Sequence, residues 1–217
     1  MPLPFFRRSK EPKPGSAAGS KGETSRRNRG VPFDGLTEEW RLVGVMHIDG
    51  RLTDALNKRE AIPIGDMKWA PVDGSAGFTD VPGLKSVDPY DLIVVLAGEG
   101  SLPPLSDAER SAHKVHKIPY DVALECPPFR VIGTVYLYPG SEPQRLLDRA
   151  TEMFVPVTDA VAMLGERRVS DADVDTVLVN RFYLRGVEQI DKRTGERHQR
   201  LPGRPLGGVS YSDRGSR

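Results

Sequence analysis

The chain is poor in the residues that most often carry chemistry. Its 217 residues include one cysteine, four histidines and two tryptophans. A single cysteine, Cys126, excludes an internal disulfide and any metal site built from several cysteines. Cys126 follows an apolar run and precedes two prolines, a context typical of a small buried side chain rather than of a nucleophile.

Long apolar runs are also missing. No stretch approaches the 18 or so apolar residues of a membrane-spanning helix, and none is predicted. The first eight residues lack the apolar core of a secretory signal, so a cytoplasmic location is expected. Phe5 and Phe6 precede two arginines, but two aromatic rings are too few for stable anchoring, and peripheral membrane contact is not predicted.

Basic residues, together with prolines, glycines and serines, are concentrated at the two ends of the sequence. Residues 1–30 hold eight basic and two acidic side chains, and 191–217 hold seven and three. From totals of 31 basic and 30 acidic, the remaining body has 16 basic and 25 acidic side chains, a net charge of −9. Segments rich in Pro, Gly, Ser, Lys and Arg bury too little apolar area to offset ordering entropy. Residues 1–33 and 192–217 are therefore predicted to be disordered basic tails.

Such tails suit acidic partners. Basic segments bind phosphates or acidic lipid headgroups, although they also serve as solvated ends or fold back on an acidic body. The candidate contact residues in the amino-terminal tail are Arg7, Arg8, Arg26, Arg27 and Arg29.

Between the tails, four blocks recur in the same order. Both 40–48 and 129–137 begin with an aromatic residue, Arg, two aliphatic residues and Gly, in that order. The other matches pair 51–54 with 145–148, 62–66 with 155–159, and 90–95 with 174–179. Ordered internal similarity indicates a duplicated module.

Each copy is predicted to be mostly β. Apolar and β-branched runs predict several short strands per copy, with one short helical segment. This content suits a small β-barrel or sandwich better than a layered α/β fold. The expected domains are a first β module over 34–100 and a second over 119–191. The connecting segment, 101–118, carries a capping pattern that predicts a helix near 107–116.

This order of strands resembles small barrels of the SH3-like or Sm-like type, and uncharacterised bacterial tandem-barrel proteins, over roughly residues 36–190. The Sm-like resemblance implies RNA binding. Arg185-Gly186 is the only match to that family's nucleic-acid motif. No functional residue is transferred from the resemblance.

Few residues suggest catalysis. His113 and His116 share a helix face if that helix forms, but two imidazoles do not make a metal site. The matched acids, Asp54 with Asp148 and Asp66 with Asp159, recur in both copies, so caps and turns explain them better than one active site does. The loop 73–89 is long enough to have a function of its own. No catalytic residue, metal ligand set or cofactor is predicted.

Two function classes remain. The first is a non-catalytic interaction or regulatory module that binds a protein partner, with the tails adding electrostatic reach. The alternative is RNA or DNA binding by the basic tails together with a mixed cationic and aromatic patch. That patch consists of Arg181, Phe182, Tyr183 and Arg185.

Overall fold

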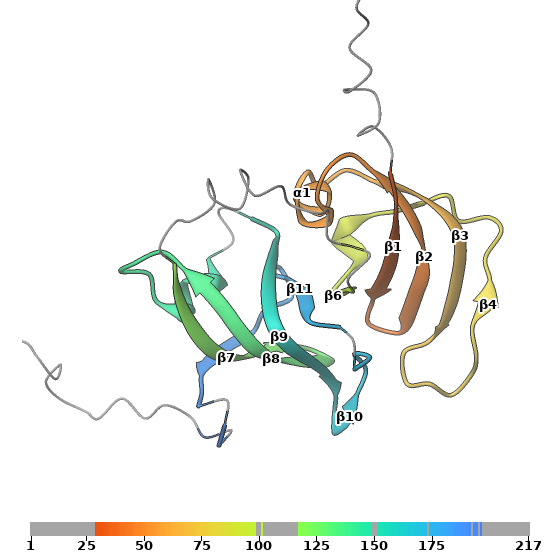
Figure 1. Ribbon diagram of the computed structural model, residues 1–217. Coiled ribbons are helices and arrows are strands. Elements are labelled where there is room, and N and C mark those ends of the chain that lie inside the picture. Colours follow the sequence, from red (N-terminus) through yellow and green to blue (C-terminus); the bar gives the residue numbers. More distant parts are fainter. Residues whose placement is uncertain are drawn as a thin grey trace, which may run out of the picture.

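The computed structural model describes residues 29–98, 101, 117–148, 152–172, 174–191, 193–194 and 196 (Figure 1). Within these residues the protein is mostly β, as predicted, with twelve strands and one α-helix. The first six strands are β1 (Arg29–Leu36), β2 (Trp40–Ile48), β3 (Ile62–Pro71), β4 (Thr79–Asp80), β5 (Ser86–Val87) and β6 (Val94–Ala97). The remaining six are β7 (Ile118–Cys126), β8 (Phe129–Leu137), β9 (Phe154–Leu164), β10 (Arg167–Arg168), β11 (Thr176–Asn180) and β12 (Gly186–Gln189). The helical segments are α1 (Leu52–Asn57) and the short 3₁₀ turns η2 (Pro89–Asp91) and η4 (Pro143–Leu147).

All the strands belong to one strongly curved antiparallel arrangement. The strand order is β12-β7-β8-β9-β11-β6-β1-β2-β3-β4, with β10 pairing β9 and β5 pairing β3. The pairing of β6 with β11 joins the first half of the chain, β1 to β6, to the second half, β7 to β12. Figure 1 shows the two halves curling away from this junction on either side.

The two halves share an irregularity in the same place. The β2–β3 ladder shifts register between Val43 and Val45, and the β8–β9 ladder shifts between Ile132 and Thr134. Each shift marks a β-bulge, in which an extra residue on one strand stands opposite the other. A glycine, Gly44 or Gly133, lies at each bulge. The bulged strand carries an aspartate with positive φ, 51° at Asp66 and 46° at Asp159. The recurrence of these two matched acids is therefore explained by the backbone conformation of the bulges.

The ends of the two halves also correspond. The amide of Ile93 donates to the Leu36 carbonyl at 2.9 Å, and the amide of Arg185 donates to the Glu125 carbonyl at 2.8 Å. Just before each of these residues, a side-chain oxygen caps a tight turn. Asp88 accepts from the amide of Tyr90 at 2.9 Å, and Asn180 accepts from the amide of Phe182 at 3.0 Å.

By these contacts, residues 88–95 of the first half are equivalent to residues 180–187 of the second. Strand β5 is then equivalent to β11, and β6 to β12. The sequence match between 90–95 and 174–179 is therefore wrong. Both segments contain a fully buried strand, and burial on both faces makes any two such strands similar in composition.

The two hydrophobic cores interlock through the central strands. On β6, Val94 and Leu96 pack into the core of the second half, whereas Val95 and Ala97 pack into that of the first. Successive side chains of a strand point to opposite faces, so a two-residue period divides one strand between two cores. Phe154, at the start of β9, belongs to the first core although it lies in the second half. Neither core is complete without residues of the other half.

Polar contacts also cross the junction. The side chain of Asn57, at the end of α1, donates to the Phe154 carbonyl at 3.3 Å and accepts from the Phe154 amide at 2.7 Å. Arg41 binds Asp34 within the first half at 2.6 Å and Asp171 of the second half at 2.8 Å. Burial raises the pKa of the Asp34 carboxyl, although its hydrogen bonds to Arg41 oppose that shift.

Some predicted boundaries differ from the structure. Strand β1 begins at Arg29, inside the segment predicted to be a disordered tail. Its Val31 and Phe33 are buried, so a short β-branched and aromatic run was hidden by the glycine and proline around it. The predicted loop 73–89 contains β4 and β5. The predicted helix near 107–116, with His113 and His116, lies outside the described residues, as do Arg7, Arg8, Arg26 and Arg27.

Candidate interaction surface

The two tryptophans of the chain stack on each other at one end of the first half. The ring centroids of Trp40 and Trp69 lie 4.9 Å apart, and the ring planes differ by 21°. Trp40 packs at the edge of the first core, whereas Trp69 has 38% of its surface exposed. A large flat apolar side chain is thereby held open to solvent on a rigid strand pair.

The strand register explains why the two rings meet. Trp40 pairs with Pro71, and Leu42 pairs with Trp69, so Trp40 and Trp69 occupy diagonal positions on one face of the β2–β3 ladder. The β-bulge shifts the alternation of β3, which puts Met67 and Trp69 on the face of the core. Met67 is buried, and Trp69 follows it at the rim.

The corresponding positions of the second half are not exposed. Phe129 pairs with Leu164, and Val131 pairs with Ala162, in the register that Trp40 and Trp69 have in the first half. Phe129 is 1% exposed and Ala162 0%. The fold can therefore close this end of a strand pair completely, and it does not require an open pair of indoles there.

A further exposed aromatic ring lies on the other face of these strands, on the side of Arg41. Phe78 precedes Thr79, the pairing partner of Trp69, and is 48% exposed. The guanidinium carbon of Arg41 lies 6.0 Å from the centre of the Phe78 ring, within the range of a cation–π contact. We call Trp40 and Trp69 together the tryptophan surface.

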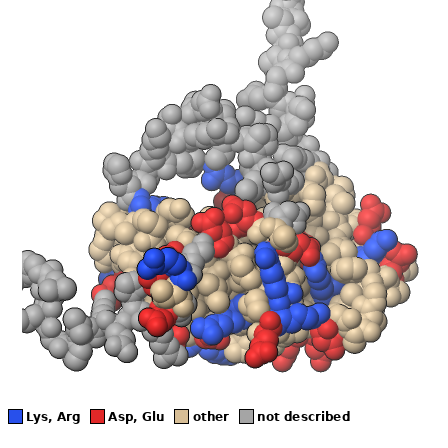
Figure 2. Space-filling model, turned by 60° about the horizontal axis from the view of Figure 1, so that its bottom comes forward, with Lys and Arg blue, Asp and Glu red and all other residues tan. Residues whose placement is uncertain are grey.

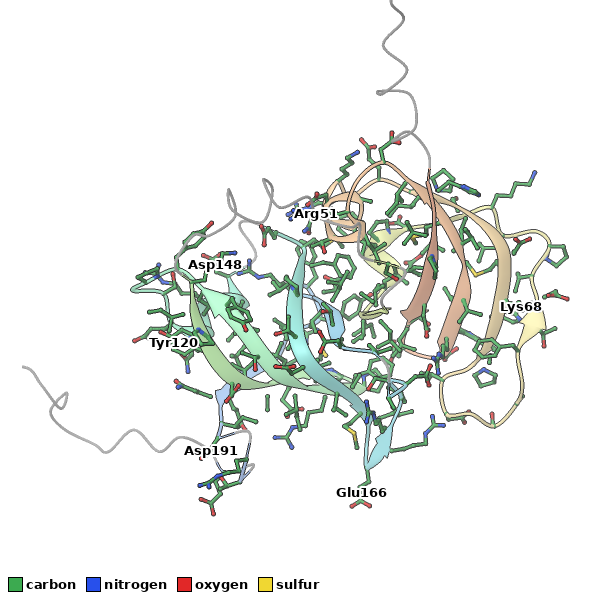
Figure 3. All side chains as sticks on the ribbon, in the orientation of Figure 1. Arg51, Lys68, Tyr120, Asp148, Glu166 and Asp191 are labelled. Atoms are coloured by element: carbon green, nitrogen blue, oxygen red, sulfur yellow. The ribbon has the colours of Figure 1, made fainter. Side chains whose placement is uncertain are left out.

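The charged side chains close to Trp40 and Trp69 in the chain differ in their partners. Lys68 lies on the outer side of β3, toward β4 (Figure 3), and pairs with Asp80 at 3.6 Å. Arg41 is held by two carboxylates. Glu38 and Glu39, next to Trp40 in the chain, are both exposed. The cations here are neutralised by partners of their own, while these two carboxylates face solvent.

The patch predicted from the sequence is divided by the structure. Arg181 is buried, and its guanidinium donates to the carbonyls of Leu146 at 2.8 Å and Arg145 at 2.7 Å, with a longer contact to Glu152. Burial lowers the pKa of Arg181. This arginine holds the segment around η4 in place rather than presenting its charge to a phosphate.

The other three predicted residues lie in different surroundings. Phe182 packs against Tyr90 at 5.8 Å between ring centres, and Arg59 stands over the Phe182 ring. The hydroxyl of Tyr183 donates to the Tyr90 carbonyl at 3.0 Å. Burial raises the pKa of that hydroxyl. Arg185 alone is exposed. Arg29, the remaining described candidate, begins β1.

Replacing Arg181 with Met, which keeps most of the volume and removes every donor, is expected to lower the free energy of unfolding by about 3 kcal/mol. Several backbone acceptors would lose a charged donor at once, at about 1–3 kcal/mol for each that is left unsatisfied. Arg185→Met, the exposed control, should cost less than about 0.5 kcal/mol. Urea unfolding followed by circular dichroism measures both. Equal costs for the two variants would show that the Arg181 contacts do not stabilise the fold.

Reactive groups are few in the part of the chain that the structure describes. Cys126 is fully buried, and burial raises the pKa of its thiol to about 12, so the nucleophilic thiolate is suppressed at neutral pH. Among the described residues no cluster of His, Cys, Asp and Glu is arranged to hold a metal ion. Nor does any helix within them have the length and apolar character needed to cross a membrane.

Figure 2 shows a face of the molecule on which Lys and Arg side chains lie among Asp and Glu side chains. The two signs are interspersed over the described residues of this face. Nucleic-acid sites generally present a concentrated field of one sign, because affinity comes from neutralising several phosphates together.

Comparison with known proteins identifies no relative. No protein-family model matches the chain, and neither a curated protein nor a solved structure is similar to it. What the chain does must therefore be argued from its own residues.

Proposed function

We propose that the protein is a non-catalytic interaction module that binds a protein partner through the tryptophan surface. The observation that carries the proposal is the exposure of Trp69, 38%, where the corresponding Ala162 is 0% exposed. Exposed tryptophans on rigid scaffolds are the side chains that most often dominate protein–protein binding energy. Exposed apolar groups that the fold does not need indicate an interaction site.

We further propose that the two halves are copies of one small SH3-like barrel module. The shared bulges, the shared positive-φ aspartates and the shared capped turns support this. A duplicated module explains how a surface can diverge in one copy while the other retains a closed core. On this view the second copy serves mainly to complete the cores, and the first carries the binding surface.

The nucleic-acid alternative draws less support from the described residues. The guanidinium of Arg181 donates hydrogen bonds to backbone carbonyls, and Phe182 is packed against Tyr90. The body between the basic ends carries more acidic than basic side chains. Binding to nucleic acid would therefore have to come from the basic ends of the chain, and it would fall steeply with salt.

The test is capture of partners by the full-length protein from its native lysate, treated with nuclease, followed by direct titration with the purified partner. Trp69→Ala is expected to weaken partner binding at least about tenfold, the loss typical of a central aromatic contact. Tyr138→Ala is the matched control, because Tyr138 is a 57% exposed aromatic residue beyond β8, in the other half.

Two results would contradict the proposal. Loss of all captured material on nuclease treatment would favour nucleic-acid binding by the basic ends. Equal affinity of the Trp69→Ala and Tyr138→Ala variants for a captured protein would place its binding site elsewhere. Unfolding curves of both variants establish that each is folded at the temperature of the assay.

A further inference from the structure

The tryptophan surface is suited to bind a segment that contains both prolines and basic side chains. Two stacked indoles give flat apolar faces, on which the pyrrolidine rings of an extended proline segment pack well. Glu38 and Glu39, which directly precede Trp40 in the chain, are exposed, whereas the cations Arg41 and Lys68 are bound by carboxylates. A segment that combines prolines with lysines or arginines therefore complements both features.

The chain contains such a segment itself. Its first 28 residues hold seven basic and two acidic side chains. Four prolines, Pro2, Pro4, Pro12 and Pro14, fall within the same stretch as four of the cations, Arg7, Arg8, Lys10 and Lys13. Prolines favour the extended left-handed helix that needs no internal hydrogen bonds, so little conformational entropy is lost when it docks.

The chain between this segment and β1 is long enough for the segment to reach the tryptophan surface. Arg29 pairs with Ile48 at one end of β2, and Trp40 begins the other end, about 26 Å away at 3.3 Å per residue. Pro14 lies 15 residues before Arg29, a length that spans up to about 50 Å when extended. Tethering of this kind gives an effective concentration on the order of millimolar, so a weak contact is enough for occupancy.

We propose that residues 2–14 of the chain bind its own tryptophan surface, and that a partner protein must displace them. This regulation rests on the proposed function for the identity of the surface. The contact itself does not need a partner and can be measured in its absence.

Fluorescence of the full-length protein tests the contact, because both tryptophans of the chain lie in the tryptophan surface. A variant with Arg7, Arg8, Lys10 and Lys13 changed to Glu should show red-shifted emission and stronger quenching by acrylamide than the natural chain. The matched control reverses four cations near the other end: Arg197, Arg200, Arg204 and Arg214. Equal emission and quenching for the two variants and the natural chain would overturn the proposal.

A synthetic peptide of residues 1–16 provides the second measurement. Added to the charge-reversed variant, it should restore the protected emission, and high salt should weaken this effect. Protection in the natural chain that appears only as protein concentration rises would overturn binding within one molecule, and would assign the site to the segment of a second copy.

The two proposals fail separately. If charge reversal leaves the indoles unchanged while Trp69→Ala still abolishes partner capture, the self-contact is wrong and the proposed function stands. If charge reversal exposes the indoles while Trp69→Ala retains the partner, the self-contact stands and the partner binds elsewhere. When both are correct, the charge-reversed variant binds the purified partner more tightly than the natural chain does.

Discussion

Replacing Phe154 with Ala is expected to lower the free energy of unfolding by about 3–5 kcal/mol, the range for removing a fully buried aromatic ring. Phe154 is 0% exposed and belongs to β9, yet it packs into the core of the first half. Its backbone is held by Asn57 through two hydrogen bonds across the junction. A single cavity should therefore destabilise both halves, a large effect for a protein whose total stability is about 5–15 kcal/mol.

Two probes, one in each half of the chain, measure this. Tryptophan fluorescence reports on the first half, which holds both tryptophans, and thiol labelling reports on the second, where Cys126 is buried. Their denaturant transitions should coincide and shift together in the Phe154→Ala variant, as in one cooperative unit. Phe78→Ala is the control and should cost less than about 1 kcal/mol, because that ring is half exposed. Separate transitions would mean that the halves fold independently.

The strands were the most predictable part of the fold. The runs at 40–48 and 129–137 combine β-branched and aromatic residues over the length of a strand, and both form strands at those bounds. The short helical segment predicted in the first copy corresponds to α1, Leu52–Asn57. These elements depend on local patterns, which a sequence displays directly.

What depends on pairing between distant segments was harder to predict. The sequence indicates a repeat, but the match of 90–95 to 174–179 is wrong, because β6 and β11 are both buried on two faces. Only the partner strands distinguish them: β6 pairs with β1 as β12 pairs with β7. Strand β1 was missed for a related reason, since its buried residues are few and its glycines and proline resemble those of a tail.

The candidate site shows the same limit. Arg181, Phe182, Tyr183 and Arg185 are close in sequence, but a tight turn sends neighbouring side chains in different directions, so composition alone could not show which were buried. The tryptophans offered one signal, because Trp40 matches Phe129 in the repeat. The exposure of Trp69 could not be read from the sequence, since it depends on the bulge that sets the face of β3.

The second large loss of stability is expected from Gly133→Ala, at the bulge of the second half. A Cβ added at Gly133 would meet the Thr158 carbonyl oxygen at 2.8 Å, the Ala160 Cα at 3.0 Å and a Val157 methyl at 2.7 Å. Two of these atoms are backbone and cannot move without distorting the strand pair. Gly44→Ala meets the Gly65 carbonyl oxygen at 2.8 Å, the corresponding backbone atom. Overpacking of this kind costs about 1–3 kcal/mol, and Gly133→Ala should lie at the upper end.

Urea unfolding of the two variants beside Gly98→Ala measures these costs. No atom lies within 4 Å of a Cβ added at Gly98, so that control should be neutral or slightly stabilising. Comparable losses at Gly44 and Gly133 would mean that both halves depend on the same close approach of carbonyl to glycine at the bulge. A loss at only one position would mean that the other strand pair can relax. The likeness of the two bulges would then not extend to their energetics, and the case for a duplicated module would rest on the strand register and the capped turns.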